Sequence, residues 1–230
     1  MNVSNSSLPR YELKFTAEPM EYFRILNWVR QHSSCFKTEY PDRQVNNIYF
    51  DTYNYNSYSE NIYGSSSKSK VRFRWYGSSN APKIGSLEVK CKRNQLNWKL
   101  IYKVQKDLSK NGEDWRELCL KIRRELPQEA KKWMEMYPLP VMINRYKRKY
   151  FISHDKKIRV TLDNDLVIYD QTRKRIPNYY SKSNLPKVVV LEIKFSREQR
   201  AHVANLLSDI PYRSSRFSKY VSGFLSMNGL

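Results

Sequence analysis

The sequence predicts an α+β protein built on a large antiparallel sheet or barrel, and three observations support this. Short segments in which apolar and polar residues alternate far outnumber segments with a helical pattern. Many of the alternating segments follow one another at the spacing of hairpins. The helical segments are spread through the chain, which favours a single α+β domain.

Nine segments alternate at period two, as expected for strands that bury one face. They are Arg10–Phe15, Val45–Asp51, Lys70–Tyr76, Ser86–Lys92, Trp98–Val104, Arg145–Ile152, Ile158–Asp163, Leu166–Tyr169 and Val188–Phe195. The polar segments Tyr53–Ser69 and Arg173–Lys187 are predicted to be irregular loops.

Helical patterns follow different signals along the chain. The first segment carries Pro19 near its first turn and places Phe23, Leu26 and Val29 on one stripe. A capping box at Ser196–Gln199 predicts the start of a later helix. The predicted helices are Glu18–His32, Asp114–Ile122, Gln128–Met136, the segment from the capping box to Leu207, and Ser218–Met227.

Length and composition indicate a folded chain of 230 residues with 40% hydrophobic and 28% charged residues. We expect residues 1–9 to be a disordered leader and residues 10–230 to form one domain. No run approaches the roughly 18–20 apolar residues that span a bilayer, and no signal peptide is evident, so we expect a cytoplasmic protein. Cys35, Cys91 and Cys119 are too scattered for a disulfide framework or a zinc site.

The net charge of +20, from 42 basic and 22 acidic residues, predicts a polyanionic partner. Nucleic acid, a membrane surface and a phosphate-rich molecule all have the required charge. No RNP, KH or zinc-finger pattern is present, so a nucleic-acid partner is not expected.

The charge is concentrated on one face of the predicted strands. In the segment KVRFRWYG, Arg72 and Arg74 alternate with Phe73 and Trp75, and no carboxylate lies among these cations. A charged strand face is ordinarily a solvated one. The alternative is a barrel whose helices cover the apolar faces, so that arginine and lysine line a lumen that fits a phosphate chain.

The motif E-x-K recurs on three predicted strands, as Glu12/Lys14, Glu88/Lys90 and Glu192/Lys194. These glutamates are too few to neutralise the cations. They suit a hard divalent ion such as Mg²⁺ or Mn²⁺, which binds one or two carboxylates together with phosphate oxygens.

An ordered set of motifs resembles the VTC domain, the catalytic domain of vacuolar transporter chaperone polyphosphate polymerases in the triphosphate tunnel metalloenzyme superfamily. The motifs are RYELKF, VNNIYFDT, KVRFRWYG, SLEVKCK, YKRKYF, IRVTLD, LEIKFS and SRFSKYVSGF, from about Arg10 to Leu225. The resemblance implies a closed antiparallel eight-stranded β-barrel with flanking helices. It also implies that the barrel binds a nucleoside triphosphate or polyphosphate with Mn²⁺ or Mg²⁺.

The resemblance further implies a role for each matching residue. The cations implied to be catalytic are Arg72, Arg74, Lys90, Arg148, Arg159 and Lys219. The residues implied to bind substrate are Lys14, Lys99, Tyr146, Lys194 and Ser218, and Lys103 competes with Lys99 for its position. The metal ligands implied are Glu192, Glu88 and Glu12.

The implied activity is transfer of the γ-phosphoryl group of ATP onto a polyphosphate chain, and the expected partners are ATP and polyphosphate or pyrophosphate. Two alternatives stay open, a triphosphatase on the same fold and a non-catalytic module that binds polyphosphate or nucleic acid. Arg10 stands where the wider superfamily carries the first glutamate of E-x-E-x-K, which favours the more basic polymerase site. Coupling to a membrane would require a separate partner. The sequence predicts no oligomeric state.

Overall fold

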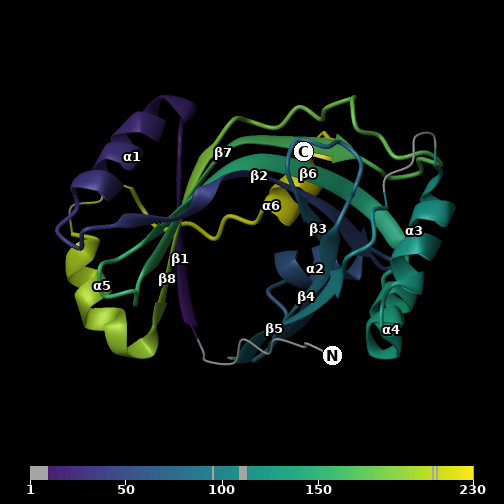
Figure 1. Ribbon diagram of the computed structural model, residues 1–230, viewed down its shortest axis with the longest axis horizontal. Coiled ribbons are helices and arrows are strands. Elements are labelled where there is room, and N and C mark those ends of the chain that lie inside the picture. Colours follow the sequence, from purple (N-terminus) through teal and green to yellow (C-terminus); the bar gives the residue numbers. More distant parts are fainter. Residues whose placement is uncertain (1–9, 95, 109–112, 209, 211, 230) are drawn as a thin grey trace.

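The computed structural model describes residues 10–229 except for 95, 109–112, 209 and 211 (Figure 1). The predicted leader, residues 1–9, lies outside the described residues. Among the helices of the described chain, none is both long and apolar enough to cross a membrane.

Eight strands form one antiparallel sheet in the order β1-β8-β7-β6-β2-β3-β4-β5. The strands are β1 (Arg10–Ala17), β2 (Lys37–Asp51), β3 (Ser67–Tyr76), β4 (Gly85–Arg93), β5 (Leu96–Val104), β6 (Leu139–Ile152), β7 (Arg159–Asp170) and β8 (Val189–Ser196). Every predicted strand is confirmed in position, but two of them belong to the same element. The segments predicted around Asp163 and Leu166 are both part of β7, because Asp165 adopts a positive φ of 54° and the pairing with β6 shifts there without ending the strand.

The predicted eight-stranded antiparallel sheet is confirmed and is strongly curved, but its closure into a barrel is not confirmed. β1 and β5 stand at the two ends of the strand order, and the described pairings do not join them. At Lys14 and Phe15 the outer edge of β1 instead contacts the C-terminal segment, because Phe15 pairs with Ser214 and the Ser215 amide donates to the Lys14 carbonyl at 2.7 Å. At these two residues the edge already has a partner and cannot also pair with β5.

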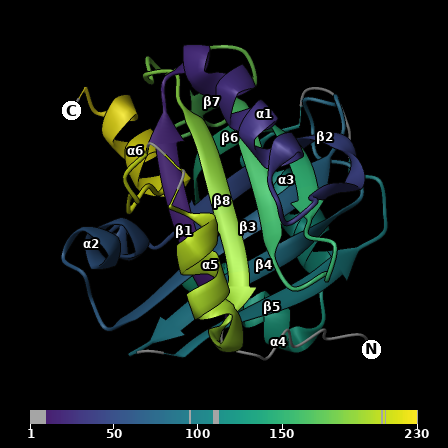
Figure 2. The ribbon, with the colours of Figure 1, turned by 90° about the vertical axis from the view of Figure 1, so that its left-hand side faces the viewer.

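Side-chain contacts show how far the sheet curls. Glu12 on β1 and Lys90 on β4 approach to 3.4 Å, although β8, β7, β6, β2 and β3 lie between their strands in the sheet. Figure 2 shows β1 and β8 in front of β3, β4 and β5, with the two groups of strands crossing. One face of the sheet therefore encloses an interior even though the sheet is not closed.

Helices cover the outer face of this sheet at its two ends (Figure 1). The C-terminal helix instead packs on the inner face, where Tyr220 contacts the cluster of Tyr49 and Tyr146. The helices are η1 (Pro19–Glu21), α1 (Tyr22–Gln31), α2 (Asn56–Ile62), α3 (Trp115–Arg124), α4 (Gln128–Met136), η2 (Arg197–Gln199), α5 (Arg200–Leu206) and α6 (Lys219–Met227). Phe73 and Trp75 of β3 are buried in one cluster with Trp115 and Ile122 of α3, so the expected packing of these aromatic residues against helices is confirmed. Apolar faces that are covered from outside leave the charged faces directed inward.

Three local predictions about helices were wrong. Phe23 was predicted on the buried stripe of the first helix but is 71% exposed, because the helix begins with a 3₁₀ turn and buries Ile25, Leu26 and Val29. The Ser196 side chain makes no capping hydrogen bond, and a 3₁₀ turn precedes α5. The predicted loop after Tyr53 contains α2, which is fixed by the buried Asp51.

Candidate functional site

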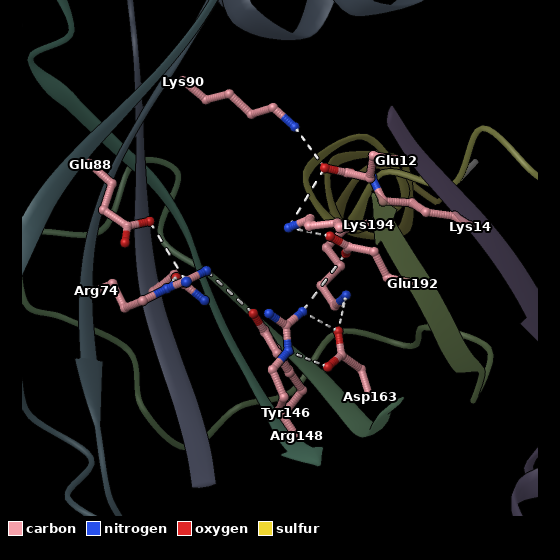
Figure 3. Close-up of polar contacts among 12 residues, drawn as sticks. Glu12, Lys14, Arg74, Glu88, Lys90, Tyr146, Arg148, Asp163, Glu192 and Lys194 are labelled. Atoms are coloured by element: carbon pink, nitrogen blue, oxygen red, sulfur yellow. Dashed lines mark hydrogen bonds and ion pairs between the residues drawn. The ribbon is translucent and has the colours of Figure 1, made fainter. Parts of the chain in front are cut away.

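The charged faces of the strands meet inside the curved sheet and form what we call the interior cluster (Figure 3). Its cationic members are Lys14, Lys70, Arg72, Arg74, Lys90, Lys99, Arg148, Lys194 and Lys219, and its carboxylates are Glu12, Glu88, Asp163 and Glu192. Nine cationic side chains thus accompany four carboxylates. Such an excess of positive charge predicts affinity for an anion that carries several charges.

One wall of the interior is organised around Glu88 of β4. Its carboxylate lies 2.6 Å from Nη2 of Arg72, 2.8 Å from Nζ of Lys99 and 3.7 Å from Nη1 of Arg74. The strand register explains this convergence, because Arg72 stands directly opposite Glu88 in the sheet. Burial raises the pKa of the Glu88 carboxyl, but the neighbouring cations outweigh burial and hold it well below its usual range. Glu88 is therefore ionised at neutral pH.

The opposite wall holds the paired carboxylates of Glu12 and Glu192. Lys14 lies 2.6 Å from Glu12, and Lys194 lies 2.5 Å from Glu192 and 3.7 Å from Glu12. Burial and the charge of Glu192 raise the pKa of Glu12, yet Lys90, Lys194 and Lys14 together lower it to about 2. Both carboxylates therefore carry a negative charge at neutral pH.

A third group of contacts joins β6, β7 and α6. Asp163, whose side chain is 1% exposed, accepts hydrogen bonds from Nε and Nη2 of Arg148 at 2.5 and 2.7 Å. It also accepts one from Nζ of Lys219 at 2.6 Å. Asp163 was not among the site residues predicted from the sequence. The one indication of its role in the sequence is its position on the same strand face as Arg159 and Thr161.

Further contacts link these groups of residues, both along the sheet and between the two walls. The Tyr146 hydroxyl lies 3.4 Å from Nη2 of Arg74, and Lys90 reaches Glu12 from the other side (Figure 3). Asn47 accepts a hydrogen bond from Nε of Arg74 at 2.8 Å, and its amide donates to Asn144 at 2.7 Å. Neither asparagine was among the site residues predicted from the sequence. The one signal is an asparagine beside an apolar residue of the strand, Asn47 before Ile48 and Asn144 after Ile143.

Most of the predicted site residues come together in or beside this cluster. Ser218 is the N-cap of α6, and its hydroxyl accepts a hydrogen bond from Lys70 at 3.1 Å. Lys99 contacts Glu88, whereas the competing Lys103 has an exposed side chain on the same strand. Arg159 lies apart, because it is 47% exposed and pairs with Glu39 at 2.8 Å.

The three predicted metal ligands do not converge on one point. Glu88 forms ion pairs with Arg72 and Lys99 on its own wall. The described residues contain no group of three or more His, Cys, Asp or Glu side chains arranged to hold a metal. Glu12 and Glu192 remain close to each other because both contact Lys194. Two carboxylates suit Mg²⁺ or Mn²⁺ when phosphate oxygens complete the coordination. The donor set therefore fits a metal that binds together with its substrate.

A cavity of about 710 Å³ lies elsewhere in the molecule. Its wall includes Ser79, Lys83, Leu118 and Tyr179, and no member of the interior cluster lines it. Its wall combines apolar and aromatic side chains with few charges, so it lacks the concentration of cations that distinguishes the interior cluster.

Acid is expected to unfold the protein between about pH 4.5 and pH 2. Glu12 and Glu192 have lower pKa values in the folded chain than the 4.5 of an unperturbed glutamate, so the folded state binds fewer protons than the unfolded state. The stability that these groups contribute is complete above pH 4.5 and is lost as the pH falls towards 2. Urea unfolding followed by far-UV circular dichroism at each pH measures this loss.

The substitution Glu12→Gln provides the control for the acid transition. It removes one group that must be protonated, so the unfolding free energy should depend less steeply on pH, by up to about 1.4 kcal/mol per pH unit. An unchanged slope below pH 4.5 would contradict the assignment of a lowered pKa to Glu12.

The comparisons with known proteins agree with this architecture. The family model described as VTC domain matches residues 9–228. A solved structure from Hippeastrum, described as a candidate adenylyl cyclase with a dominant triphosphatase activity, has a TM-score of 0.52 and 14% identity, with 95% of this chain and 96% of that chain covered. A candidate adenylate cyclase from Vibrio parahaemolyticus has a TM-score of 0.49 and 14% identity, covering 94% and 98% of the two chains. At these identities the first likeness shows the fold alone. Among curated proteins, none matches this chain significantly.

Proposed function

Because the chain belongs to the VTC domain family, we propose that it is a polyphosphate polymerase. In this proposal ATP donates its γ-phosphoryl group to the end of a polyphosphate chain that lies in the interior of the curved sheet. The observation that carries the proposal is the excess of nine cationic side chains over four carboxylates on facing walls of that interior. A bound phosphate chain would supply the negative charge that the four carboxylates of the interior do not provide.

The interior cluster fits phosphoryl transfer because this reaction needs alignment and charge stabilisation more than covalent catalysis. An oxygen of the terminal phosphate of the acceptor attacks the γ-phosphorus of ATP, the bond to the β,γ-bridging oxygen breaks, and ADP leaves with the electron pair. Arg72 and Arg74 on one wall and Arg148 on the other would stabilise the charge on the transferred group. The acceptor oxygen is already anionic, so no general base is required.

A divalent metal would assist this chemistry. Glu12 and Glu192 would hold Mn²⁺ or Mg²⁺, and the bound ion would supply positive charge that offsets the charge of the phosphates. The role of these two residues is then to hold an ion on the wall opposite Arg72 and Arg74. Glu88 has a different role in the proposal, because its ion pairs keep Arg72 and Lys99 in position.

A triphosphatase is the second candidate. The solved structure from Hippeastrum, which is described as having a dominant triphosphatase activity, has the same fold. On the same residues, water in place of the acceptor phosphate would give hydrolysis. The products therefore distinguish the two reactions.

Incubation of the purified protein with ATP and Mn²⁺ or Mg²⁺, with and without pyrophosphate as a primer, is expected to yield ADP together with lengthening polyphosphate chains. The chains are resolved by gel electrophoresis, and ADP and free phosphate are measured in the same reactions. The exposed Lys132 on α4 provides a control, since Lys132→Met removes one positive charge outside the interior cluster and should leave the yield unchanged.

Two other outcomes of this incubation would contradict the proposed polymerase activity. Free phosphate without chains would replace the polymerase by the triphosphatase. The absence of both products with either metal would leave only a module that binds polyanions.

A further inference from the structure

Lys70 differs from the other lysines of the interior cluster. It lies on β3 two residues before Arg72, on the inward face, and its half-buried side chain reaches Ser218 of α6. The remaining interior lysines each have a carboxylate within 4 Å. These pairs are Lys14–Glu12, Lys90–Glu12, Lys99–Glu88, Lys194–Glu192 and Lys219–Asp163. Within the described residues, no carboxylate lies within 4.0 Å of Lys70.

The surroundings of Lys70 are instead cationic and aromatic. Its strand neighbour on β4 is Lys90, and Arg72 and Lys68 share its strand face. Lys14 faces it from β1, and the ring of Tyr220 on α6 lies 6.0 Å from its Nζ. Burial and then the charges of Lys90, Lys14, Lys68 and Arg72 lower the pKa of Lys70 to about 7. Near pH 8 this side chain is therefore mostly an uncharged amine.

We propose that Lys70 is a proton-coupled phosphate ligand, which takes up a proton when a polyanion binds in the interior of the sheet. The inference rests on the proposed function, because it requires that a phosphate chain enters this interior. A phosphate group near Nζ would supply the negative charge that the protein does not provide at this position. The charged form of the amine then becomes the favoured one, and binding draws a proton from solution.

The contact with Ser218 is compatible with both forms of the side chain. A hydroxyl group can donate a hydrogen bond to a neutral amine and can accept one from an ammonium group. Nζ therefore keeps its partner, 3.1 Å away, when it gains the proton. The same hydroxyl is the N-cap of α6, so Lys70 is held beside the end of the helix that carries Lys219.

Proton uptake on binding is measurable without turnover. The probe is inorganic tripolyphosphate, and its binding is measured by titration calorimetry near pH 8 in two buffers with different ionisation enthalpies. The difference in heat between the buffers gives the number of protons taken up. The wild type is expected to take up nearly one proton more than Lys70→Met.

The variant Lys70→Arg separates charge from proton coupling. Arginine stays charged at every pH of the experiment, so this variant should bind tripolyphosphate without the extra proton. Between pH 7 and pH 9, the affinity of the wild type should fall more steeply than that of Lys70→Arg, by up to about tenfold per pH unit. Protons exchanged by Lys99 or by the probe occur in every variant and cancel in the comparison.

The outcomes separate this inference from the proposed function. Equal proton uptake by the wild type, Lys70→Met and Lys70→Arg, with binding retained, would overturn the inference and leave the proposed function standing. A wild type that binds no tripolyphosphate at any pH would overturn both. Lys132→Met controls for the loss of one positive charge and should behave as the wild type does.

Discussion

Replacement of Asp163 by asparagine is expected to lower the free energy of unfolding by about 3–5 kcal/mol. Asp163 is the shared partner of Arg148 and Lys219, and all three side chains are largely withdrawn from solvent. An amide of the same shape cannot compensate two positive charges. The variant would leave Arg148 with only the more distant carboxylate of Glu192, 3.9 Å away, and would remove the paired carboxylate of Lys219. Urea unfolding at pH 7 measures the loss.

The same substitution two residues away provides the control. Asp165 pairs with Lys147 at 2.9 Å, but its side chain is 56% exposed, and a surface ion pair contributes about 0–1 kcal/mol. Asparagine also tolerates the positive φ at this position. Asp165→Asn should therefore cost less than about 1 kcal/mol. Equal losses for the two variants would contradict the structural role given to Asp163.

Tripolyphosphate should act differently on these two variants. In Asp163→Asn, Arg148 and Lys219 lose the carboxylate that they share, so a bound anion replaces the missing charge and restores part of the stability. The gain in melting temperature on adding tripolyphosphate should be larger for Asp163→Asn than for Asp165→Asn. This comparison connects the stability of the fold to the proposed use of its interior.

The sequence predicted the strands well because alternation of apolar and polar residues is a local property. The alternation in KVRFRWYG was enough to assign Arg72 and Arg74 to one face and Phe73 and Trp75 to the other. Strand ends were less predictable. Within β7, the sequence Asp163-Asn-Asp165 resembles a turn. Pairing with β8 ends at Asp163, but pairing with β6 continues beyond Asp165 and keeps the segment in one strand.

The errors concern features that depend on contacts between distant segments. Whether the sheet closes depends on which segment occupies the outer edge of β1, and that segment, around Ser214, is about 200 residues away in the chain. The helix α2 forms in a polar stretch because the carboxylate of Asp51 accepts hydrogen bonds from backbone amides, among them that of Ser57 at 2.9 Å. Neither contact has a signature in the local sequence.

The candidate site was predicted as a list of residues but not as a network. The alternation of side chains along each strand was sufficient to place most of the cations on the inward faces. Which carboxylate pairs with which cation depends on strand register. The alternation of polar and apolar residues within one strand does not specify which residue of the next strand stands opposite. For this reason Asp163 and Asn47 were missed, and Glu88 was grouped with metal ligands although the structure gives it three cationic neighbours.

Replacement of Arg74 by alanine is expected to reduce the turnover of ATP by at least about 10³-fold, with the fold retained. The Arg74 side chain stands between Glu88 of β4 and Tyr146 of β6, so its guanidinium group can reach a phosphate that lies between them. Among the residues that the structure describes, no carboxylate is closer to Arg74 than 3.7 Å, which leaves its charge available to the transferred group. Turnover is measured as ADP released per protein, and the fold is checked by circular dichroism.

Arg145 on β6 gives a matched control for this variant. Nε of Arg145 donates to Asn46 at 3.0 Å just as Nε of Arg74 donates to Asn47 at 2.8 Å, but Asn46 and Asn47 are adjacent in a strand and point to opposite faces of the sheet. Arg145→Ala therefore removes a similar hydrogen bond on the outer face and should leave turnover within a few-fold of the wild type. If both variants lose activity equally, the loss reflects damage to the sheet. If Arg74→Ala keeps full turnover, phosphoryl transfer does not take place beside Arg74, and the reaction must be assigned to another part of the molecule.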